Sequence, residues 1–326
     1  MMNRPLSLVL LAAGLAGCKP PPPAPESLNE ASKYMVRNFY ADDATFGAGV
    51  QGFMDWYNNE GFELVGQSST LDTTESFQIA DLTTEDVAHL PLDTEIVDDI
   101  GNVDDPTDDV YIPRDPTAAA GVISIDEMDC TWVETEQYLI RPDQDAIFNG
   151  DWDAYERTYI TPRETFEEAS ASGRFTRINQ PLEPFTDGFD PADYADTLLF
   201  TDNMVDPSPV AGGLGDIGVY PLDLDMRHGF FEVDGEERGV LSVITYNRAA
   251  AWGVAGANGL VQSYSIELNV QLESNTTLRM LAVWAEPRSG ILDPDSAFAL
   301  NYAVNKSLAS SERLSAICDG SATPGD

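Results

Sequence analysis

Basic residues are scarce in this chain. Its 326 residues include 56 aspartates and glutamates but only 17 lysines and arginines, which gives a formal net charge of −39 at pH 7. Three of these cations are lysines, namely Lys19, Lys33 and Lys306. Nucleic-acid binding and electrostatic attachment to anionic lipid both need clustered cations, so the composition argues against both. The acidity is typical of a heavily solvated surface.

Histidine is also rare, and the usual catalytic motifs are missing. The two histidines, His89 and His228, have no chelating spacing, and we expect both to be surface or hydrogen-bonding residues. The sequence contains no nucleophile elbow and no metalloprotease helix motif. A G-x-G-x-x-G run at residues 213–218 precedes Pro221 instead of a helix, so we interpret it as a flexible loop.

Calcium is the metal that the sequence suggests most specifically. Seven residues with side-chain oxygens fall in one acidic stretch, and such oxygens are the ligands that calcium prefers. They are Asp98, Asp99, Asn102, Asp104, Asp105, Asp108 and Asp109. The order of ligands that an EF-hand requires does not occur there. We therefore predict no cofactor and no metal, with calcium at this stretch as the alternative.

The first eighteen residues carry the most specific pattern. Arg4 precedes an apolar run at residues 6–15, and Ala16 and Gly17 then lead to Cys18. The run is much shorter than the ~20 residues of a membrane span. The pattern resembles the lipobox signal peptide of bacterial lipoproteins. This resemblance implies cleavage after residue 17, a lipid on the Cys18 thiol, and a place in the cell envelope.

Three further expectations accompany a lipid at Cys18. Lys19 stands where an aspartate marks inner-membrane retention in enterobacterial lipoproteins, so the resemblance implies the outer membrane, on either face. Cys130 and Cys318 are then an even pair in an oxidising compartment, which favours a disulfide. Residues 18–26 form a proline-rich tether that, at ~3.1 Å per residue, holds the folded body roughly 20 Å from the membrane.

Residues 27–117 form a predicted helical and acidic region. Apolar residues at helical spacing predict one helix from Leu28, capped by Ser27, and a second over residues 46–57. Residues 62–80 suggest short strands. Residues 81–129 contain fifteen acidic residues and one basic residue, Arg114, so we interpret them as a connector without packed elements. We place a domain boundary near residue 117.

Residues 118–320 form a predicted α+β domain, followed by a disordered tail at 321–326. We expect a strand at 153–161, a helix at 162–173, and a hairpin turning at Asp234-Gly235. Residues 264–272 alternate strictly between apolar and polar, which is typical of an antiparallel sheet covered on one side. Their partner is residues 278–284. A long helix begins at Asp293-Pro294 and ends at Gly320.

This order of elements over residues 120–318 resembles the helix-grip domains of START-like lipid-transfer and polyketide-cyclase-like proteins. The resemblance implies an antiparallel sheet packed against a long C-terminal helix, with a cavity for an apolar ligand between them. Trp252, Tyr264 and Trp284 are the candidate cavity residues, and we expect Trp284 to point at the terminal helix. No catalytic residue is carried over.

The sequence therefore predicts a membrane-anchored, non-catalytic lipoprotein that binds an apolar small molecule or lipid. Two alternatives stay open. One is an extracytoplasmic hydrolase that uses a pair of carboxylates, for which two buried acids with raised pKa values would be evidence. The other is an envelope interaction module without a small ligand. The sequence leaves the oligomeric state open.

Overall fold

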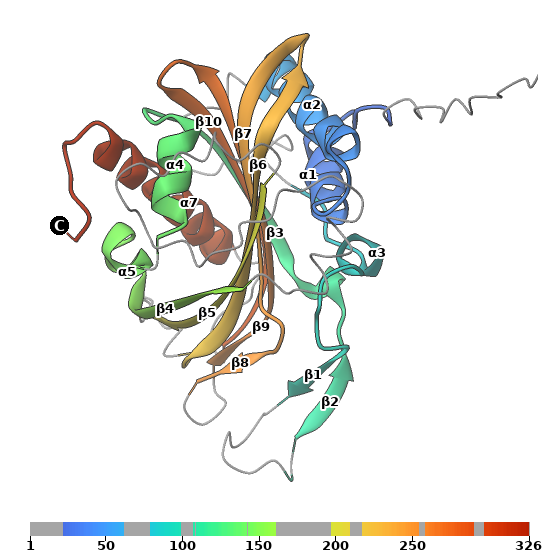
Figure 1. Ribbon diagram of the computed structural model, residues 1–326. Coiled ribbons are helices and arrows are strands. Elements are labelled where there is room, and N and C mark those ends of the chain that lie inside the picture. Colours follow the sequence, from blue (N-terminus) through green and yellow to red (C-terminus); the bar gives the residue numbers. More distant parts are fainter. Residues whose placement is uncertain are drawn as a thin grey trace, which may run out of the picture.

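A single antiparallel sheet forms the centre of the molecule, with helices on both of its faces (Figure 1). Figure 1 is a computed structural model of the chain. It describes residues 22–61, 79–98, 107, 109–141, 143–160, 197–208, 217–253, 258–289 and 297–325.

The sheet has eight strands in the order β3-β10-β9-β7-β6-β5-β4, with β8 paired to β9. Their bounds are β3 Ala120–Met128, β4 Trp152–Ile160, β5 Thr197–Pro207, β6 Tyr220–Val233, β7 Glu236–Tyr246, β8 Ala251–Trp252, β9 Asn258–Glu273 and β10 Thr276–Ser289. A separate two-stranded ladder, β1 (Glu95–Asp98) with β2 (Val110–Pro113), projects from one end of the molecule (Figure 1).

Two groups of helices cover the sheet (Figure 1). One face, called the α1 face below, carries α1 (Leu28–Arg37), α2 (Asp43–Asn59) and α3 (Thr84–Val87). The other, called the α7 face, carries α4 (Trp132–Leu139), α5 (Gln144–Ile147) and the 22-residue helix α7 (Ala297–Cys318). A short 3₁₀ turn, η3 (Pro116–Ala118), precedes β3.

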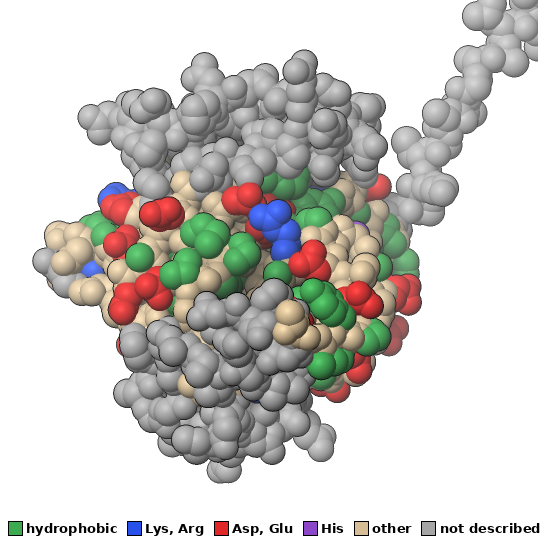
Figure 2. Space-filling view, turned by 90° about the horizontal axis from the view of Figure 1, so that it is seen from below, with side chains coloured by type: hydrophobic (Ala, Val, Ile, Leu, Met, Phe, Trp, Pro, Cys, Tyr) green, Lys and Arg blue, Asp and Glu red, His purple; other side chains and the backbone are tan. Residues whose placement is uncertain are grey.

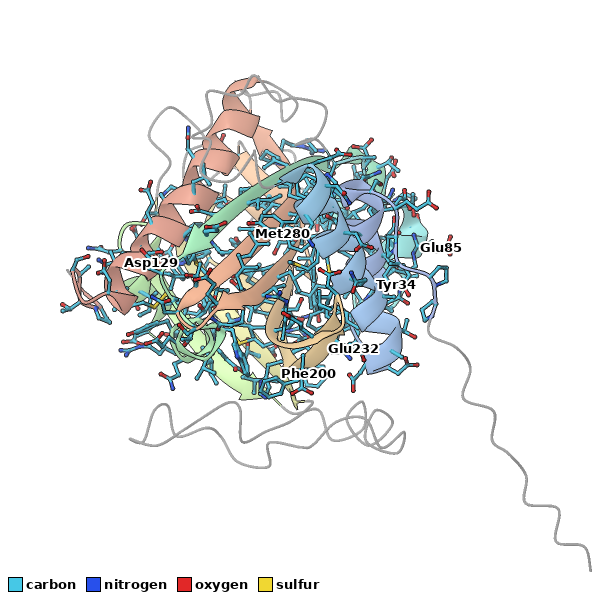
Figure 3. All side chains as sticks on the ribbon, turned by 90° about the horizontal axis from the view of Figure 1, so that it is seen from above. Tyr34, Glu85, Asp129, Phe200, Glu232 and Met280 are labelled. Carbon is cyan, nitrogen blue, oxygen red and sulfur yellow. A yellow bond between two sulfur atoms is a disulfide. The ribbon has the colours of Figure 1, made fainter. Side chains whose placement is uncertain are left out.

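The α1 face holds the main hydrophobic core. Alternation along β9 and β10 turns Ile266, Leu268 and Met280 towards α1 and α2, and all three are fully buried. Met280 and Phe200, labelled in Figure 3, mark this layer. Because the same core joins α1 and α2 to the sheet, it crosses the predicted boundary near residue 117.

Local sequence signals account for several elements. The predicted first helix is confirmed as α1, where the Glu30 backbone N–H donates to the Ser27 hydroxyl at 3.2 Å. The predicted second helix is confirmed as α2. The β6–β7 hairpin turns at Asp234 and Gly235, which both have positive φ (53° and 77°), as the Asp-Gly signal predicts. The paired strands β9 and β10 are confirmed and longer than predicted.

The expectation that residues 81–129 lack packed elements was wrong. Besides α3 and the β1–β2 ladder, this stretch contains β3, which pairs with β10 along its full length. Val122, Ile123 and Ile125 supply its buried side chains. Because acidic residues stand at the end of β3, the composition of residues 81–129 as a whole does not reveal the apolar centre of this strand.

The expectation that helices cover the sheet on one side was also wrong. The polar positions of β9 face α7 instead of water, and both Glu267 and Asn269 are buried. Glu267 does not leave an unpaired charge in the interior, because it forms a buried ion pair with Arg279.

The tether is shorter than its sequence suggests. A Cβ added at Gly52 of α2 would lie 2.7 Å from the Pro25 ring and from the Pro25 carbonyl oxygen, so Pro25 packs directly on α2. Pro22 and Ala24 also lie against the folded body. The predicted helix at 162–173, most of the predicted strands at 62–80 and the residues Asp293 and Pro294 lie outside the described residues.

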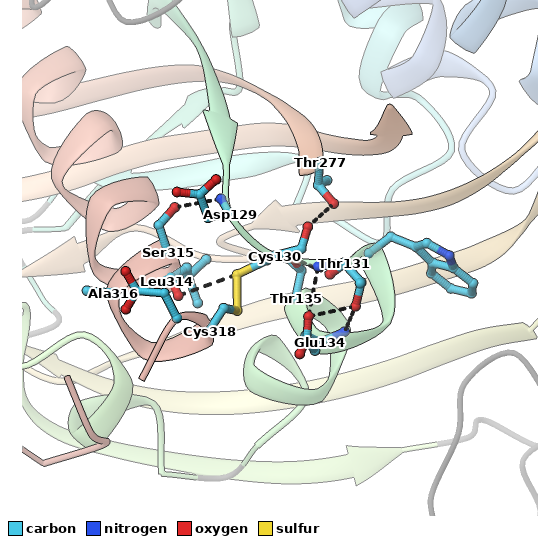
Figure 4. The surroundings of a disulfide bond; sticks show 12 residues. Asp129, Cys130, Thr131, Glu134, Thr135, Thr277, Leu314, Ser315, Ala316 and Cys318 are labelled. Carbon is cyan, nitrogen blue, oxygen red and sulfur yellow. Dashed lines mark hydrogen bonds between the residues drawn. A yellow bond between two sulfur atoms is a disulfide. The ribbon is translucent and has the colours of Figure 1, made fainter. Parts of the chain in front are cut away.

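Cys130 and Cys318 form a disulfide with 5.4 Å between their Cα atoms (Figure 4). This is the pair that the cysteine count favours. Cys130 follows β3 and precedes α4, and Cys318 is the last residue of α7. The Thr277 hydroxyl donates to the Cys130 carbonyl oxygen at 2.7 Å, which joins the bridge to β10. The bond therefore ties α7 to one edge of the sheet.

Candidate functional site

Four side chains in the middle of the α7 face are only half-buried. Leu224, Thr245, Ser265 and Val283 lie side by side in register on the adjacent strands β6, β7, β9 and β10. We call them the middle row. Central positions of a sheet that is covered on both faces are normally buried completely, so the described helices leave this part of the α7 face accessible. We call this accessible part of the face the hollow.

The middle row is uncharged in a chain of net charge −39. Leu224 and Val283 offer apolar surface, whereas Thr245 and Ser265 add hydroxyls that make no side-chain hydrogen bond to the described residues. An apolar floor with a few polar groups is the usual composition of a small-molecule site. Seen from the β8 end, hydrophobic side chains lie among carboxylates with few cations between them (Figure 2).

A buried ion pair beside the middle row fastens α7 to the sheet. Arg279 of β10 makes two hydrogen bonds to the Glu267 carboxylate, at 2.9 and 3.0 Å. Its guanidinium also donates to the hydroxyls of Ser310 and Ser311 on α7, at 2.6 and 2.8 Å. The geometry satisfies both charges, so this polar contact sets the position of the helix without adding net charge to the hollow.

A second polar contact on this face fastens α4. His228 of β6 and Glu136 of α4 are both buried, and His228 Nδ1 lies 2.6 Å from Glu136 Oε1. Two acceptors on the α7 face, Glu136 Oε2 and Asn269 Oδ1, have no hydrogen-bond partner within the part of the chain that the structure describes.

At the other end of the face, Arg157 of β4 donates to Asn203 of β5 at 2.8 Å and to the Arg141 carbonyl oxygen at 3.0 Å. Polar contacts thus hold the covering segments on either side of the middle row. The apolar clusters of this face are correspondingly separate. One contains Met226, Leu241 and Leu314, and the other contains Val205 and Leu222.

The α1 face contains a different cluster, of acids and tyrosines. Burial raises the pKa of Asp225 to about 7, although the hydroxyl of Tyr40 donates to its carboxylate. Burial and the neighbouring carboxyl of Asp202 raise the pKa of Asp223 to about 7. Arg248 bridges this pair, with 2.8 Å to Asp202 and 2.9 Å to Asp223. Asp202 and Arg248 are each 40% exposed, so the cluster reaches solvent at that end.

The candidate cavity residues lie elsewhere. Tyr264 and Trp284 are buried in the core of the α1 face, and the Trp284 indole N–H donates to the Ala80 carbonyl oxygen at 3.1 Å. Trp284 therefore faces the N-terminal helices, which corrects the expectation that it points at the terminal helix. Trp252 donates to the Val97 carbonyl oxygen at 3.0 Å and holds the β1–β2 ladder.

The remaining residues that the sequence singled out lie as follows. Cys18 lies outside the described residues. Of the proposed calcium ligands, Asp98 and Asp109 are described, and no group of three or more metal-ligating side chains occurs among the described residues. His89 is exposed, with its ring 5.4 Å from that of Tyr40. None of the described helices has both the length and the hydrophobicity that crossing a membrane requires.

Sequence reasoning missed the middle row and the acid cluster. Leu224, Thr245 and Ser265 are ordinary residues within strands, and only their register brings them together. Asp223 and Asp225 stand two apart in Leu222-Asp223-Leu224-Asp225, a spacing that places two acids on one face of a strand. That alternation was the available signal.

No family model matches the chain, and no curated protein matches its sequence. Three solved structures are similar to it. A STAR-related lipid transfer protein fragment from Xanthomonas axonopodis is 11% identical, with a TM-score of 0.36, over 70% of this chain and 99% of that one. A START superfamily protein from Mycobacterium smegmatis is 10% identical, with a TM-score of 0.29, over 62% and 99%. The Zhui aromatase/cyclase from a Streptomyces species is 12% identical, with a TM-score of 0.30, over 62% and 94%. At these TM-scores the likeness carries no argument about this chain.

Proposed function

We propose that this protein is a lipid-anchored envelope protein that binds an uncharged, largely apolar small molecule or lipid in the hollow of its α7 face. The helix-grip interpretation, with α7 as the gripped helix, is part of this proposal. The observation that carries it is the middle row, whose four side chains stay accessible although they lie on central strands of the sheet.

The chemistry of the hollow supports this class of ligand. The middle row has no charge, and the nearest buried charges neutralise each other in the Arg279–Glu267 pair. Binding an anion would require an unpaired cation, and binding a cation would require an unpaired carboxylate. An apolar molecule with a hydroxyl or carbonyl group fits the floor, because Thr245 and Ser265 offer hydroxyls for it.

The test is to identify what the purified protein carries. Native mass spectrometry of the chain prepared from its own envelope should show a bound neutral molecule. Ser265→Phe fills the hollow and should abolish that mass difference. Ser274→Phe, the same change in the exposed β9–β10 turn, should leave it unchanged. A Ser265→Phe variant that folds, by its melting curve, and still carries the molecule would contradict the proposal.

Anchoring is tested separately. The Cys18→Ser variant should move from the membrane fraction to the soluble fraction, and the peptide containing Cys18 should lose the mass of its lipid. Sorting to the outer membrane is proposed from Lys19 and is tested by density separation of the two membranes. A wild-type chain without a lipid at Cys18 would contradict this part alone.

The acid pair on the α1 face favours a second candidate, a hydrolase. Asp223, with a pKa of about 7, has the protonation of a general acid near neutrality, and Asp202 beside it reaches solvent. Hydrolysis of a glycoside or ester that is lost in Asp223→Asn but retained in Glu232→Gln, a change at an exposed position of β6, would establish it. Catalysis unaffected by Asp223→Asn would remove this candidate.

A further inference from the structure

We propose that the docked tether holds one particular face of the protein on the bilayer, so that α2 and the β6–β7 hairpin contact net-neutral lipid. This inference rests on the proposed lipid at Cys18. We call the surface the anchor face and define it by Pro22, Ala24, Asp43, Ala44, Gly47 and Phe230.

The first observation is where the tether meets the body. Pro25 packs against Gly52, and the chain continues towards Cys18 along the wall of a groove of about 490 Å³ that Pro22 and Ala24 help to line. Glycine at position 52 gives Pro25 its room, because a methyl group there would lie 2.7 Å from the proline ring. Residues 22–25 are therefore part of the folded surface.

The second observation is how little chain remains. Cys18 stands four residues before Pro22, and a fully extended chain covers at most roughly 14 Å over that distance. A lipid on Cys18 inserts into the membrane, so the docking point of Pro22 cannot lie farther than that from the lipid headgroups. The free span is shorter than the width of the protein body, so it limits which surface can approach the membrane.

The third observation is the chemistry of the anchor face. Phe230 borders the groove and is 44% exposed at the end of the sheet where β6 and β7 turn, and its ring lies 5.6 Å from that of Trp132 on α4. An exposed aromatic ring at this end of the sheet suits the headgroup boundary of a bilayer. The charged residues that line the groove are acidic, namely Asp43 and Glu232, and Asp43 pairs with Arg227. Contact with a net-neutral lipid surface is therefore favoured over contact with an anionic one.

The test is photo-crosslinking of the full lipidated protein in phosphatidylcholine vesicles that contain a photoactivatable phosphatidylcholine. Cross-links should fall several-fold more often on residues 43–51 and 228–237 than on residues 109–113. The latter include Tyr111, which is 59% exposed on the β1–β2 ladder at the other end of the molecule (Figure 1). Vesicles that contain phosphatidylglycerol should give fewer cross-links on the anchor face.

Gly52→Ala should displace Pro25 and spread the cross-links over both regions. Asn59→Ala changes an exposed position of the same helix outside the anchor face and should keep the wild-type pattern. Equal labelling of the two regions in the wild type, or a pattern that Gly52→Ala leaves unchanged, would overturn the inference.

Failure of the premise is distinguishable from failure of the inference. If mass spectrometry finds no lipid on Cys18, the proposed attachment fails. A maleimide-bearing lipid coupled to Cys18 of the oxidised chain, in which Cys130 and Cys318 are already bonded, then supplies the anchor. The cross-linking pattern of that conjugate decides the orientation by itself.

Discussion

The two faces of the sheet have opposite designs. On the α1 face the side chains of β9 and β10 form a continuous apolar core, fully buried against α1 and α2, and the acid cluster lies apart on β5 and β6. The α7 face is held by buried polar contacts, its apolar side chains form separate clusters, and its middle row stays accessible. The comparison indicates that the α1 face stabilises the fold by apolar packing, whereas the α7 face is held by polar contacts on either side of the accessible hollow.

The largest effect should come from breaking the polar contact that holds α7. Arg279→Met leaves the Glu267 carboxylate buried without a counter-ion, so we expect a loss of about 3–5 kcal/mol in the free energy of unfolding. Replacing both residues, as Arg279→Met with Glu267→Met, should recover most of this loss. Urea denaturation measures both. Equal losses in the single and double variants would show that the charge pair does not clamp the helix.

An intermediate effect should separate the two faces directly. Leu268 on the α1 face is fully buried, and Leu224 on the α7 face is only half-buried. Leu268→Ala should cost about 2–5 kcal/mol of unfolding free energy, because it leaves a cavity in a packed core. The identical change Leu224→Ala should cost roughly 1 kcal/mol or less, since its side chain already borders a hollow. Similar losses from the two variants would contradict the contrast between the faces.

A third effect concerns pH. The folded protein raises the pKa of Asp225 from 3.8 to about 7, so the folded state holds a proton that the unfolded chain releases. The stability associated with this proton is fully present below about pH 4 and is lost as the pH rises through about 7. Asp225→Asn should flatten the fall in melting temperature between these pH values.

Glu232→Gln serves as the control for this pH dependence, because it removes a carboxylate at an exposed position of the same strand. It should leave the slope as in the wild type. A slope that survives Asp225→Asn would show that Asp225 is not its source, and the same measurement on Asp223→Asn would then separate the acid cluster from the general surface charge.

The sequence predicted the α1 face better than the α7 face, for a physical reason. Alternation in β9 identifies Ile266 and Leu268 as core, because apolar side chains have one favourable environment. Polar side chains have two favourable environments, namely solvent and a buried position that supplies hydrogen-bond partners. Glu267 and Asn269 resemble solvent-facing positions, but Arg279 of β10 pairs with the Glu267 carboxylate, which also accepts a hydrogen bond from the Asn269 side chain.

The same limit explains the errors about β3 and about Trp284. The composition of residues 81–129 is dominated by carboxylates, and pairing with β10 is what makes Ala120–Met128 a strand. The position of Trp284 within β10 was predicted, but which helices cover that side of the sheet depends on topology. Residues of the middle row become neighbours through strand register, and no local pattern encodes a register between strands that are far apart in the chain.

The disulfide also sets an order of assembly. It joins residues 188 apart, and the loop that it closes contains every strand from β4 to β10. Helix α7 follows every strand of the sheet in the chain, so the α7 face is completed after the sheet has been synthesised. The bridge can form only once α7 lies beside the end of β3. Closing of the α7 face is thereby linked to docking of this helix, and a chain whose α7 is undocked keeps both thiols free.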